Sequence, residues 1–440
     1  MGDVVSAFWF SLSARAQDLA VLAAWLAPTA VALAVVLWRY RVRPLVHALL
    51  VRHRGIAAIA VALIALSVGL GVALLAEERG LRQASARAAD RFDLIVAAPG
   101  SDVTAMLASV YLQTANMALL APSVHADLAA RPDVDLVAPL AFGDSVDGAP
   151  LVGTTAAFVD HLAGAPREGR PFASTAEAVV GAATDFAIGD VLHPAHGHGA
   201  GADEDAHAHV EFLVVGRLAA TGTPWDRAVV VPLEAVWIAH GLGDGHAAAD
   251  RGRIGPPYDP ERMPGVPAIV VRADSLVANY ALRSAFTGAD RMAFFPGEVL
   301  ARLHGLLGDV RRVLSAMALV TEVLVVAAVI ALLAVLLGGS ARRFAMLRAL
   351  GAPRGFVFAV AWVHGSVLVL AGAVLGIGVG RLAALALARY LSEASAVAVR
   401  PLPAIADLSL VAAFALAGVA LAAVPAWIVS GRKVLADLRA

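Results

Sequence analysis

Histidines gather in one short segment, and they are the residues of this chain best suited to bind a metal. Five of the 13 histidines fall within 17 positions, together with three acidic residues: His193, His196, His198, His207 and His209, with Asp203, Glu204 and Asp205. Imidazole and carboxylate groups suit Zn²⁺, Cu²⁺ or Ni²⁺, and the intervening glycines let the segment fold inward. The segment 193–209 is therefore predicted to be a metal-binding loop. A solvated insertion between two strands is the alternative.

Other chemistry is excluded by residues that the sequence lacks. A phosphate-binding loop needs Gly-x-x-x-x-Gly-Lys-Ser/Thr, but the only lysine is Lys433, which follows Arg432 near the C-terminus. The sequence has no cysteine, no His-Glu-x-x-His motif and no Gly-x-Ser-x-Gly elbow. A net charge of −1 gives no reason to expect nucleic acid as a partner. We therefore predict that the chain is not an enzyme and carries no intrinsic cofactor, apart from a metal at the histidine-rich segment.

The composition is that of a membrane protein. Hydrophobic residues make up 60% of the chain and charged residues 16%, whereas soluble proteins carry about 25% charged residues. A helix needs about 20 apolar residues to cross a bilayer. Five stretches qualify: 20–38, 55–76, 323–341, 355–380 and 408–431. Pro28 interrupts the first, which either spans the membrane or lies in its interface.

Arginines set the predicted orientation. They concentrate in the links 39–54 and 342–354, and Arg432 and Lys433 follow the last apolar stretch. Positive residues favour the cytoplasmic side, so segment 77–312 is expected outside. The predicted fold is an α-helical membrane protein with four core transmembrane helices, and a fifth at the N-terminus if 20–38 spans. A large α+β extracytoplasmic domain is inserted between the first and second core spans. The predicted parts are 1–54, 55–76, 77–312 and 313–440.

Short apolar runs predict the elements of the outer domain. Strands are expected at 92–96, 136–140, 210–216, 228–231 and 268–272, and helices at 103–120, 175–186, 233–240 and 275–286. Apolar residues also continue at helical spacing from Val299 into the third apolar stretch, without a proline. We expect one helix that leaves the membrane and enters the outer domain. It either carries displacement between the two compartments or only connects them.

The link before the fourth stretch contains Leu-Arg-Ala-Leu-Gly-Ala at 347–352, preceded by Arg342 and Arg343. This link resembles the cytoplasmic loop of the MacB/FtsX family of ABC transporter permeases. The order of spans and outer domain is similar to that family, and fragments 177–181, 212–217 and 221–227 resemble its periplasmic core domain. The resemblance covers roughly residues 45–435. The additional first span departs from the family pattern, as does Arg343, which stands where the family commonly has glutamate.

The resemblance implies a permease subunit in the bacterial cytoplasmic membrane. Its expected partners are a cytoplasmic ABC ATPase that binds the ATP, a second permease copy or a related permease, membrane lipids, and a periplasmic or outer-membrane protein. Two functions follow from it. One is ATP-driven export or extraction of a lipoprotein, peptide, small toxic molecule or metal-linked species. The other is a non-transporting scaffold that activates an extracytoplasmic enzyme.

The resemblance also implies which residues contact the ATPase. Apolar side chains of the loop are spaced as on one short amphipathic helix, which is able to dock in a partner's groove. In the alternative, the arginines only fix the topology and meet lipid headgroups. The predicted coupling residues are Arg342, Arg343, Phe344, Met346, Leu347, Arg348, Leu350 and Gly351.

Glycines repeat every four residues in the fourth apolar stretch, at Gly372, Gly376 and Gly380. Such a row lies on one face of a helix and lets a neighbouring helix approach closely. We predict that these glycines form a helix-packing surface.

Overall fold

A computed structural model describes residues 9, 11–113, 115–197, 210–395, 398–401, 404–432 and 434. The chain divides into two compact units. Unit 1 comprises Met1–Gly80, Asp309–Arg389 and Arg400–Ala440, and unit 2 comprises Leu81–Gly308 and Tyr390–Val399. The predicted outer domain, 77–312, corresponds to most of unit 2, but the short segment 390–399 also belongs to unit 2.

Unit 1 is built from helices, three of which continue into unit 2. They are α2 (Ala14–Arg39), α3 (Arg43–Arg52), α4 (Arg54–Ala89), α10 (Pro296–Gly338), α11 (Ala341–Ala349), α12 (Arg354–Ser395), α13 (Ile405–Leu421) and α14 (Ala423–Gly431). Four described helices are long and apolar enough to cross a membrane: Ala14–Arg39, Arg54–Ala89, Arg354–Ser392 and Asp407–Gly431. A fifth is counted if Val323–Gly338 and Ala341–Ala349, which are bent by 53°, form one span.

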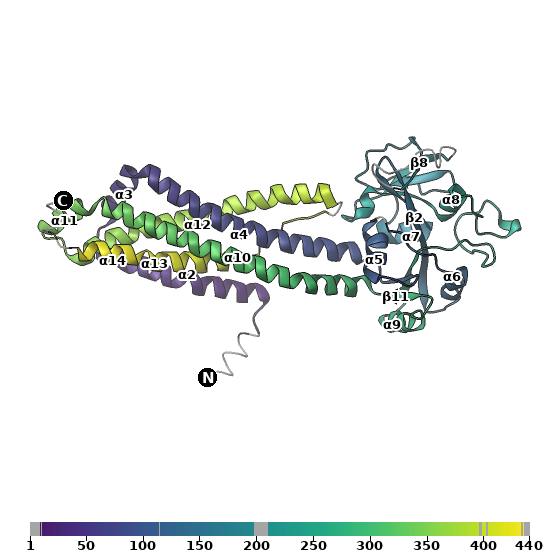
Figure 1. Ribbon diagram of the computed structural model, residues 1–440, viewed down its shortest axis with the longest axis horizontal. Helices are drawn as coiled ribbons and strands as arrows, with labels where there is room; N and C mark the ends of the chain where they lie inside the picture. The colour runs from purple at the N-terminus through teal and green to yellow at the C-terminus, as the bar shows by residue number, and fades with distance from the viewer. Residues whose placement is uncertain are drawn as a thin grey trace. The chain divides into compact units, whose positions relative to one another are not determined.

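The N-terminal helix α2 differs from the prediction at Pro28, because the helix runs through this proline without a break. The Ser13 side chain caps its first turn by accepting a hydrogen bond from the amide of Ala16. The helix packs beside α13 (Figure 1), and Thr29 is its buried residue. Between Leu19 and Trp38 the helix carries no charged residue, and its exposed side chains there are mostly apolar, as in a helix that faces lipid.

The helix predicted to continue beyond the third apolar stretch is present as α10 (Figure 1). It is continuous over 43 residues, which corresponds to about 65 Å at 1.5 Å per residue. The border between the two units falls inside this helix, as it does inside α4 and α12.

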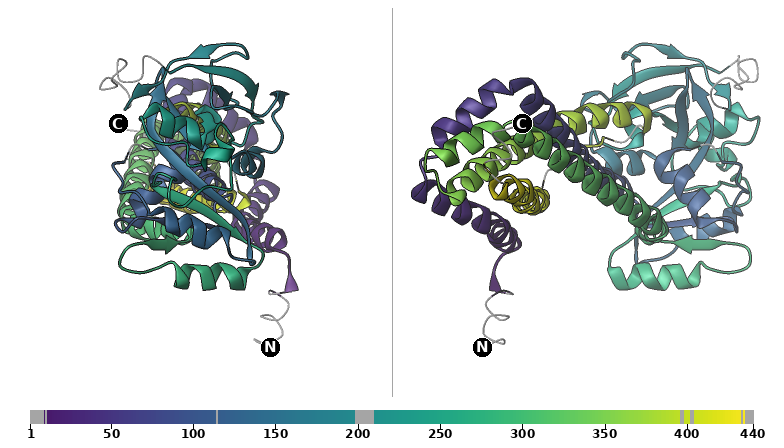
Figure 2. Two further views of the ribbon diagram at one scale, coloured as in Figure 1. Left: turned by 90° about the vertical axis from the view of Figure 1, so that its right-hand side faces the viewer. Right: turned by 60° about the vertical axis from the view of Figure 1, so that its left-hand side comes forward.

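Unit 2 contains one 11-stranded mixed sheet. Its main path is β11-β1-β10-β2-β3-β9-β5-β8-β4, while β6 pairs with β8 and β7 pairs with β2. β2 is 13 residues long and pairs with β10 near its start and with β3 and β7 near its end (Figure 2). The strands are β1 (Leu94–Ala97), β2 (Val134–Val146), β3 (Ala149–Thr154), β4 (Glu168–Gly169), β5 (Glu177–Val180), β6 (Val191–Leu192), β7 (Ala195–His196), β8 (Phe212–Arg217), β9 (Val229–Pro232), β10 (Ala268–Ala273) and β11 (Met292–Phe294).

Both faces of this sheet are buried, as alternation along β1 shows. Leu94 and Val96 belong to one hydrophobic cluster, and Ile95 and Ala97 belong to another, because successive side chains of a strand point to opposite faces. The first cluster includes residues of α6 (Pro122–Ala129), α8 (Leu233–Ala239) and α9 (Leu276–Ala285). The second includes residues of α5 (Asp102–Tyr111) and α7 (Ala156–Ala163).

Two predicted helices of the outer domain are wrong in part. The segment 175–186 contains the strand β5, whose residues pair with β8 and β9. Val179 and Val180 are fully buried there, and β-branched side chains suit such a position. The helix predicted at 103–120 ends at Tyr111, because Leu112 adopts a left-handed conformation with φ 54°.

Candidate functional site

The predicted ATPase-coupling segment forms the separate short helix α11. Its apolar residues divide between two faces. Phe344 is buried in the core of unit 1, and Leu347 packs against the same core. Met346 and Leu350, by contrast, are 46% and 86% exposed. The single apolar stripe predicted from the sequence is therefore two surfaces, one that holds α11 to unit 1 and one that is exposed.

The arginines of this segment also differ in their surroundings. Arg342 is exposed, whereas Arg343 is half-buried and lines a cavity of about 270 Å³ together with Leu347 and residues of α3. The guanidinium of Arg348 donates hydrogen bonds to the carbonyl oxygens of Ser430 and Arg432, at 3.3 and 2.5 Å. A cation at the last carbonyls of a helix is favourable, so Arg348 also stabilises the C-terminal end of α14. Gly351 follows with φ +100° and ends the segment.

The predicted packing glycines lie against α4. A β-carbon on Gly372 would lie 2.6 Å from the β-carbon of Ile64, and one on Gly376 would lie 2.7 Å from that of Val68. A β-carbon on Gly380 would lie 2.6 Å from the carbonyl oxygen of Gly69. Real β-carbons do not approach so closely, so α4 and α12 reach this separation only because the three positions are glycine.

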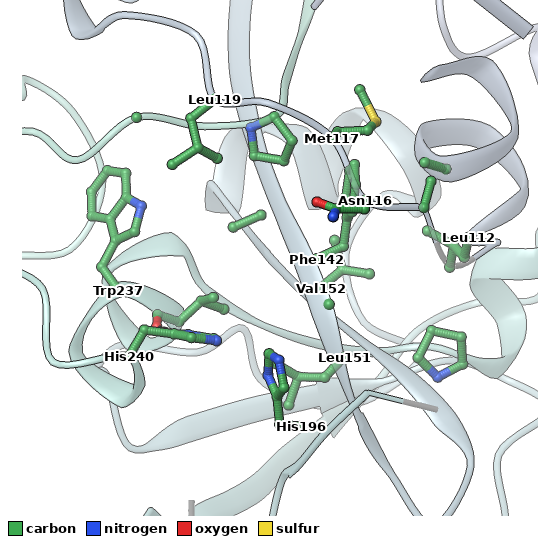
Figure 3. Close-up of a pocket in the computed structure, with 18 of the residues that line it drawn as sticks. Leu112, Asn116, Met117, Leu119, Phe142, Leu151, Val152, His196, Trp237 and His240 are labelled. Atoms are coloured by element: carbon green, nitrogen blue, oxygen red, sulfur yellow. Dashed lines mark hydrogen bonds between the residues drawn. The ribbon is translucent and has the colours of Figure 1, made fainter. Parts of the chain in front are cut away.

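A hollow in unit 2 offers space for a ligand. It measures about 570 Å³ and is lined by β2, β3, α8 and the segment that follows α5. Figure 3 shows the rings of His196 and His240 near one end of the hollow, with Met117 and Leu119 toward the other. Most of the lining residues are apolar, and the polar side chains among them are the two imidazoles, Gln113 and Asn116. Sequence reasoning did not identify this hollow, because its walls come from several segments that are far apart in the sequence.

Asp144 joins the two imidazoles in a compact group. Its Oδ1 lies 3.0 Å from Nδ1 of His196 and 3.6 Å from Nε2 of His240. One potential ligand atom from each of the three residues lies within 4.8 Å of the others. Asp144 is 1% exposed, and a buried carboxylate is costly unless positive charge or hydrogen-bond donors compensate it. The group has the donor chemistry of a transition-metal site.

Backbone geometry places Asp144 and His196 together. They are direct partners in the antiparallel pairing of β2 with β7, so their side chains lie on the same face of the sheet. The register of β2 against β3 shifts between Phe142 and Asp144, where Gly143 has φ +146°. This is a β-bulge, a device that redirects the side chain beside it.

His240 caps the end of α8, and its tautomer follows from its partners. Its Nδ1 lies 2.9 Å from the carbonyl oxygen of Val236. A carbonyl oxygen only accepts hydrogen bonds, so Nδ1 carries the proton. A neutral His240 therefore turns the Nε2 lone pair toward Asp144.

Of the five histidines predicted to bind metal, the structure describes two. His196 belongs to the group with Asp144, whereas His193 is exposed and lies outside it. His198, His207 and His209 lie outside the described residues. The prediction did not include Asp144 or His240. Asp144 lies in a strand and His240 at the end of a helix, and no local sequence pattern indicates that they lie close together.

The sequence reasoning also missed an ion pair between α4 and α13. Arg79 contacts both carboxylate oxygens of Asp407, and the NH1–Oδ2 distance is 2.9 Å. Both residues belong to unit 1. The carboxylate also accepts a hydrogen bond from the amide of Ala404, 3.0 Å away, and so caps the start of α13.

No protein-family model matches the chain, and no curated protein matches it. Solved structures that are similar to part of it include two extracytoplasmic regions of transporters. The periplasmic region of MacB from Actinobacillus actinomycetemcomitans is 14% identical at a TM-score of 0.31, covering 50% of this chain and 95% of that one. The extracellular domain of the noncanonic ABC-type transporter YknZ from Gram-positive bacteria is 12% identical at a TM-score of 0.29, covering 46% and 98%.

Proposed function

We propose that the chain is the permease subunit of an ABC transporter that takes its ATPase from a separate polypeptide. The observation that carries the proposal is the geometry of α11. This helix is held to unit 1 by Phe344 and Leu347, while Leu350 and Met346 remain exposed on its other surface. Exposed apolar residues within an arginine-rich link favour contact with a protein partner. The resemblance of 347–352 to the cytoplasmic loop of MacB/FtsX permeases supports the same assignment.

The proposal includes a cytoplasmic position for α11 and an extracytoplasmic position for unit 2, in a bacterial cytoplasmic membrane. Two copies of the chain, or this chain and a related permease, assemble with two ATPase subunits. ATP-driven movement of α11 passes into the helices α10 and α12, both of which continue into unit 2. The hollow of about 570 Å³ in unit 2 favours transport over signalling, because it offers space for a small molecule or a peptide side chain.

The test is a substitution on the exposed surface of α11. Leu350→Asp places a charge where docking would desolvate it, which costs several kcal/mol, but it leaves the buried Phe344 untouched. Val51→Asp is the matched control, because Val51 is a 56% exposed apolar residue of the neighbouring basic link. The tagged chain is purified from its own host, and the ATPase subunit is identified by mass spectrometry through its Gly-x-x-x-x-Gly-Lys-Ser/Thr motif.

We expect Leu350→Asp to reduce the co-purified ATPase subunit and its ATP hydrolysis at least ten-fold. Val51→Asp should retain both. The proposal is wrong if no subunit with that motif accompanies the native chain, or if Leu350→Asp retains association and hydrolysis at the native level.

A further inference from the structure

We propose that Asp144, His196 and His240 form a binding site for a divalent transition metal at the edge of the unit 2 hollow. The site goes beyond the permease assignment and rests on different residues. The test of this site is therefore independent of the Leu350→Asp experiment, because either proposal can fail while the other holds.

The donor separations fit one ion. A tetrahedral site with metal–ligand bonds of 2.0–2.1 Å has its donor atoms about 3.3 Å apart. The carboxylate Oδ1 of Asp144 lies 3.0 Å from Nδ1 of His196 and 3.6 Å from Nε2 of His240. Both distances lie within 0.4 Å of the tetrahedral edge, and the two imidazole nitrogens lie within 4.8 Å of each other. Without a metal, Nδ1 of His196 donates a hydrogen bond to Asp144, so a bound ion would displace that proton.

The buried carboxylate of Asp144 and the lone pair of His240 favour a cation between them. The Val236 carbonyl fixes the proton of His240 on Nδ1, so Nε2 presents a lone pair to an anionic, 1% exposed carboxylate. The Nε2 lone pair and the carboxylate oxygen, 3.6 Å apart, repel unless a proton or a metal ion lies between them, and the His240 ring, whose side chain is 33% exposed, is open to an ion from solvent. The hydrogen bond of a ring N–H to a backbone carbonyl is also the usual outer contact of metal-binding histidines.

The three ligands stand on ordered elements. Asp144 and His196 are paired across β2 and β7, and His240 follows the last turn of α8. Ligands on paired strands and helix ends are better preorganised than ligands on a flexible loop. We therefore expect this group to bind more tightly than scattered histidines elsewhere in the chain.

The ligand class follows from the donors. Two imidazoles and one carboxylate suit Zn²⁺ or Cu²⁺, with Cu²⁺ bound more tightly, and three protein ligands leave a position for water or another molecule. His196 and His240 also line the hollow. A molecule held there with a carboxylate, thiol or amine donor would complete the coordination.

The experiment uses the full chain in detergent micelles, freed of metal with a chelator and titrated with Zn²⁺ by calorimetry. His240→Ala removes one ligand, and Asp144→Asn removes the carboxylate charge at nearly constant size. His193→Ala is the matched control, because His193 is an exposed histidine of the same segment that lies outside the group. Thermal melts of the metal-free variants establish that they are folded.

We expect one Zn²⁺ per native chain at this site, with affinity reduced at least ten-fold in His240→Ala and Asp144→Asn and unchanged in His193→Ala. Zn²⁺ should also raise the melting temperature of the native chain and of His193→Ala, but not that of the other two variants. If His240→Ala binds Zn²⁺ with native affinity, the proposal is overturned and the metal belongs to other histidines. The proposal is also overturned if the native chain binds no Zn²⁺ at 50 µM, roughly the upper end of the dissociation constant for a preorganised site.

A second measurement serves if His240→Ala or Asp144→Asn does not fold. The nitrogen couplings in the electron paramagnetic resonance spectrum of one Cu²⁺ per native chain count the bound imidazoles. Two imidazoles support the site, because the group contains His196 and His240 only. Any other number of imidazoles would overturn it.

Discussion

Arg79 and Asp407 form a two-pronged salt bridge across 328 positions of sequence, between helix α4 and the start of α13. The two partners differ in exposure, because the Asp407 side chain is 3% exposed and that of Arg79 is 30% exposed. Removing the arginine would leave a buried carboxylate without its cation. Removing the carboxylate would leave a cation that water already reaches.

We therefore predict an asymmetric response. Arg79→Met should lower the free energy of unfolding by about 3 kcal/mol, and Asp407→Asn should lower it by less. The double variant should regain part of the loss, because it leaves no unpaired charge. Thermal unfolding of the four proteins in one detergent measures this cycle, and equal losses in the two single variants would contradict the assignment.

The row of glycines in α12 gives a second prediction. Gly376→Ala places a β-carbon 2.7 Å from that of Val68, so α4 and α12 must separate, which costs about 1–3 kcal/mol. Gly378→Ala is the matched control, because the nearest described atoms lie beyond 4 Å of its new β-carbon. We expect a lower melting temperature for Gly376→Ala only. A similar loss in both variants would indicate that helix flexibility, not close packing, is the reason for glycine.

The stability of the folded chain should also decrease as the pH falls, because of His125 in α6. This side chain is buried against the ring of Tyr258, and burial lowers its pKa from 6.5 to about 4. Between these values the unfolded chain binds more protons than the folded chain, so acidification from pH 7 to pH 5 should cost about 2 kcal/mol. Thermal melts at pH 7, 6 and 5 should show this loss in the native chain.

His125→Phe is the control for that loss, since it cannot take up a proton. The carboxyl of Glu177, whose pKa is lowered to about 2 by Arg170, loses its contribution only below about pH 4.5 and leaves this window clear. If the native chain and His125→Phe lose stability in parallel between pH 7 and pH 5, other groups are responsible.

The orientation of the chain is testable because the sequence contains no cysteine. Leu350→Cys and Val277→Cys introduce single thiols at positions that are 86% and 80% exposed. A membrane-impermeant maleimide added to cells with a permeabilised outer membrane should label Val277→Cys, and should label Leu350→Cys only after the inner membrane is lysed. The reverse pattern would invert the predicted topology.

The sequence predicted the long-range layout better than the ligand group, for a physical reason. Apolar length and helical spacing are local properties, so the five apolar stretches and the continuation of α10 were readable from the chain. The four-residue spacing of Gly372, Gly376 and Gly380 is local as well. The two different surfaces of α11 could not be predicted from the sequence, because only the fold decides that Leu347 packs inward and Leu350 does not.

The group around Asp144 depends on strand register. The cluster of histidines around His196 predicts that it binds metal. Its partner Asp144 lies 52 positions away in the sequence, directly opposite it in the pairing of β2 with β7. A shift of one residue would turn Asp144 to the other face of the sheet. Nothing in the residues around Asp144 or His240 specifies that register, and the bulge at Gly143 is visible only once the strands are paired.

The contacts of Arg348 mean that α11 is connected to three helices, in addition to the packing of Phe344 and Leu347 on the core of unit 1. The covalent chain links it to α10 and α12, and the hydrogen bonds from Arg348 to the carbonyls of Ser430 and Arg432 tie it to the end of α14. A pull on α11 would therefore be shared among three helices and would resist tilting about any one of them. Without the Arg348 side chain, only the two covalent links and the packing of Phe344 and Leu347 would hold α11, so a force applied by a docked partner would tilt the short helix more easily and displace the bundle less.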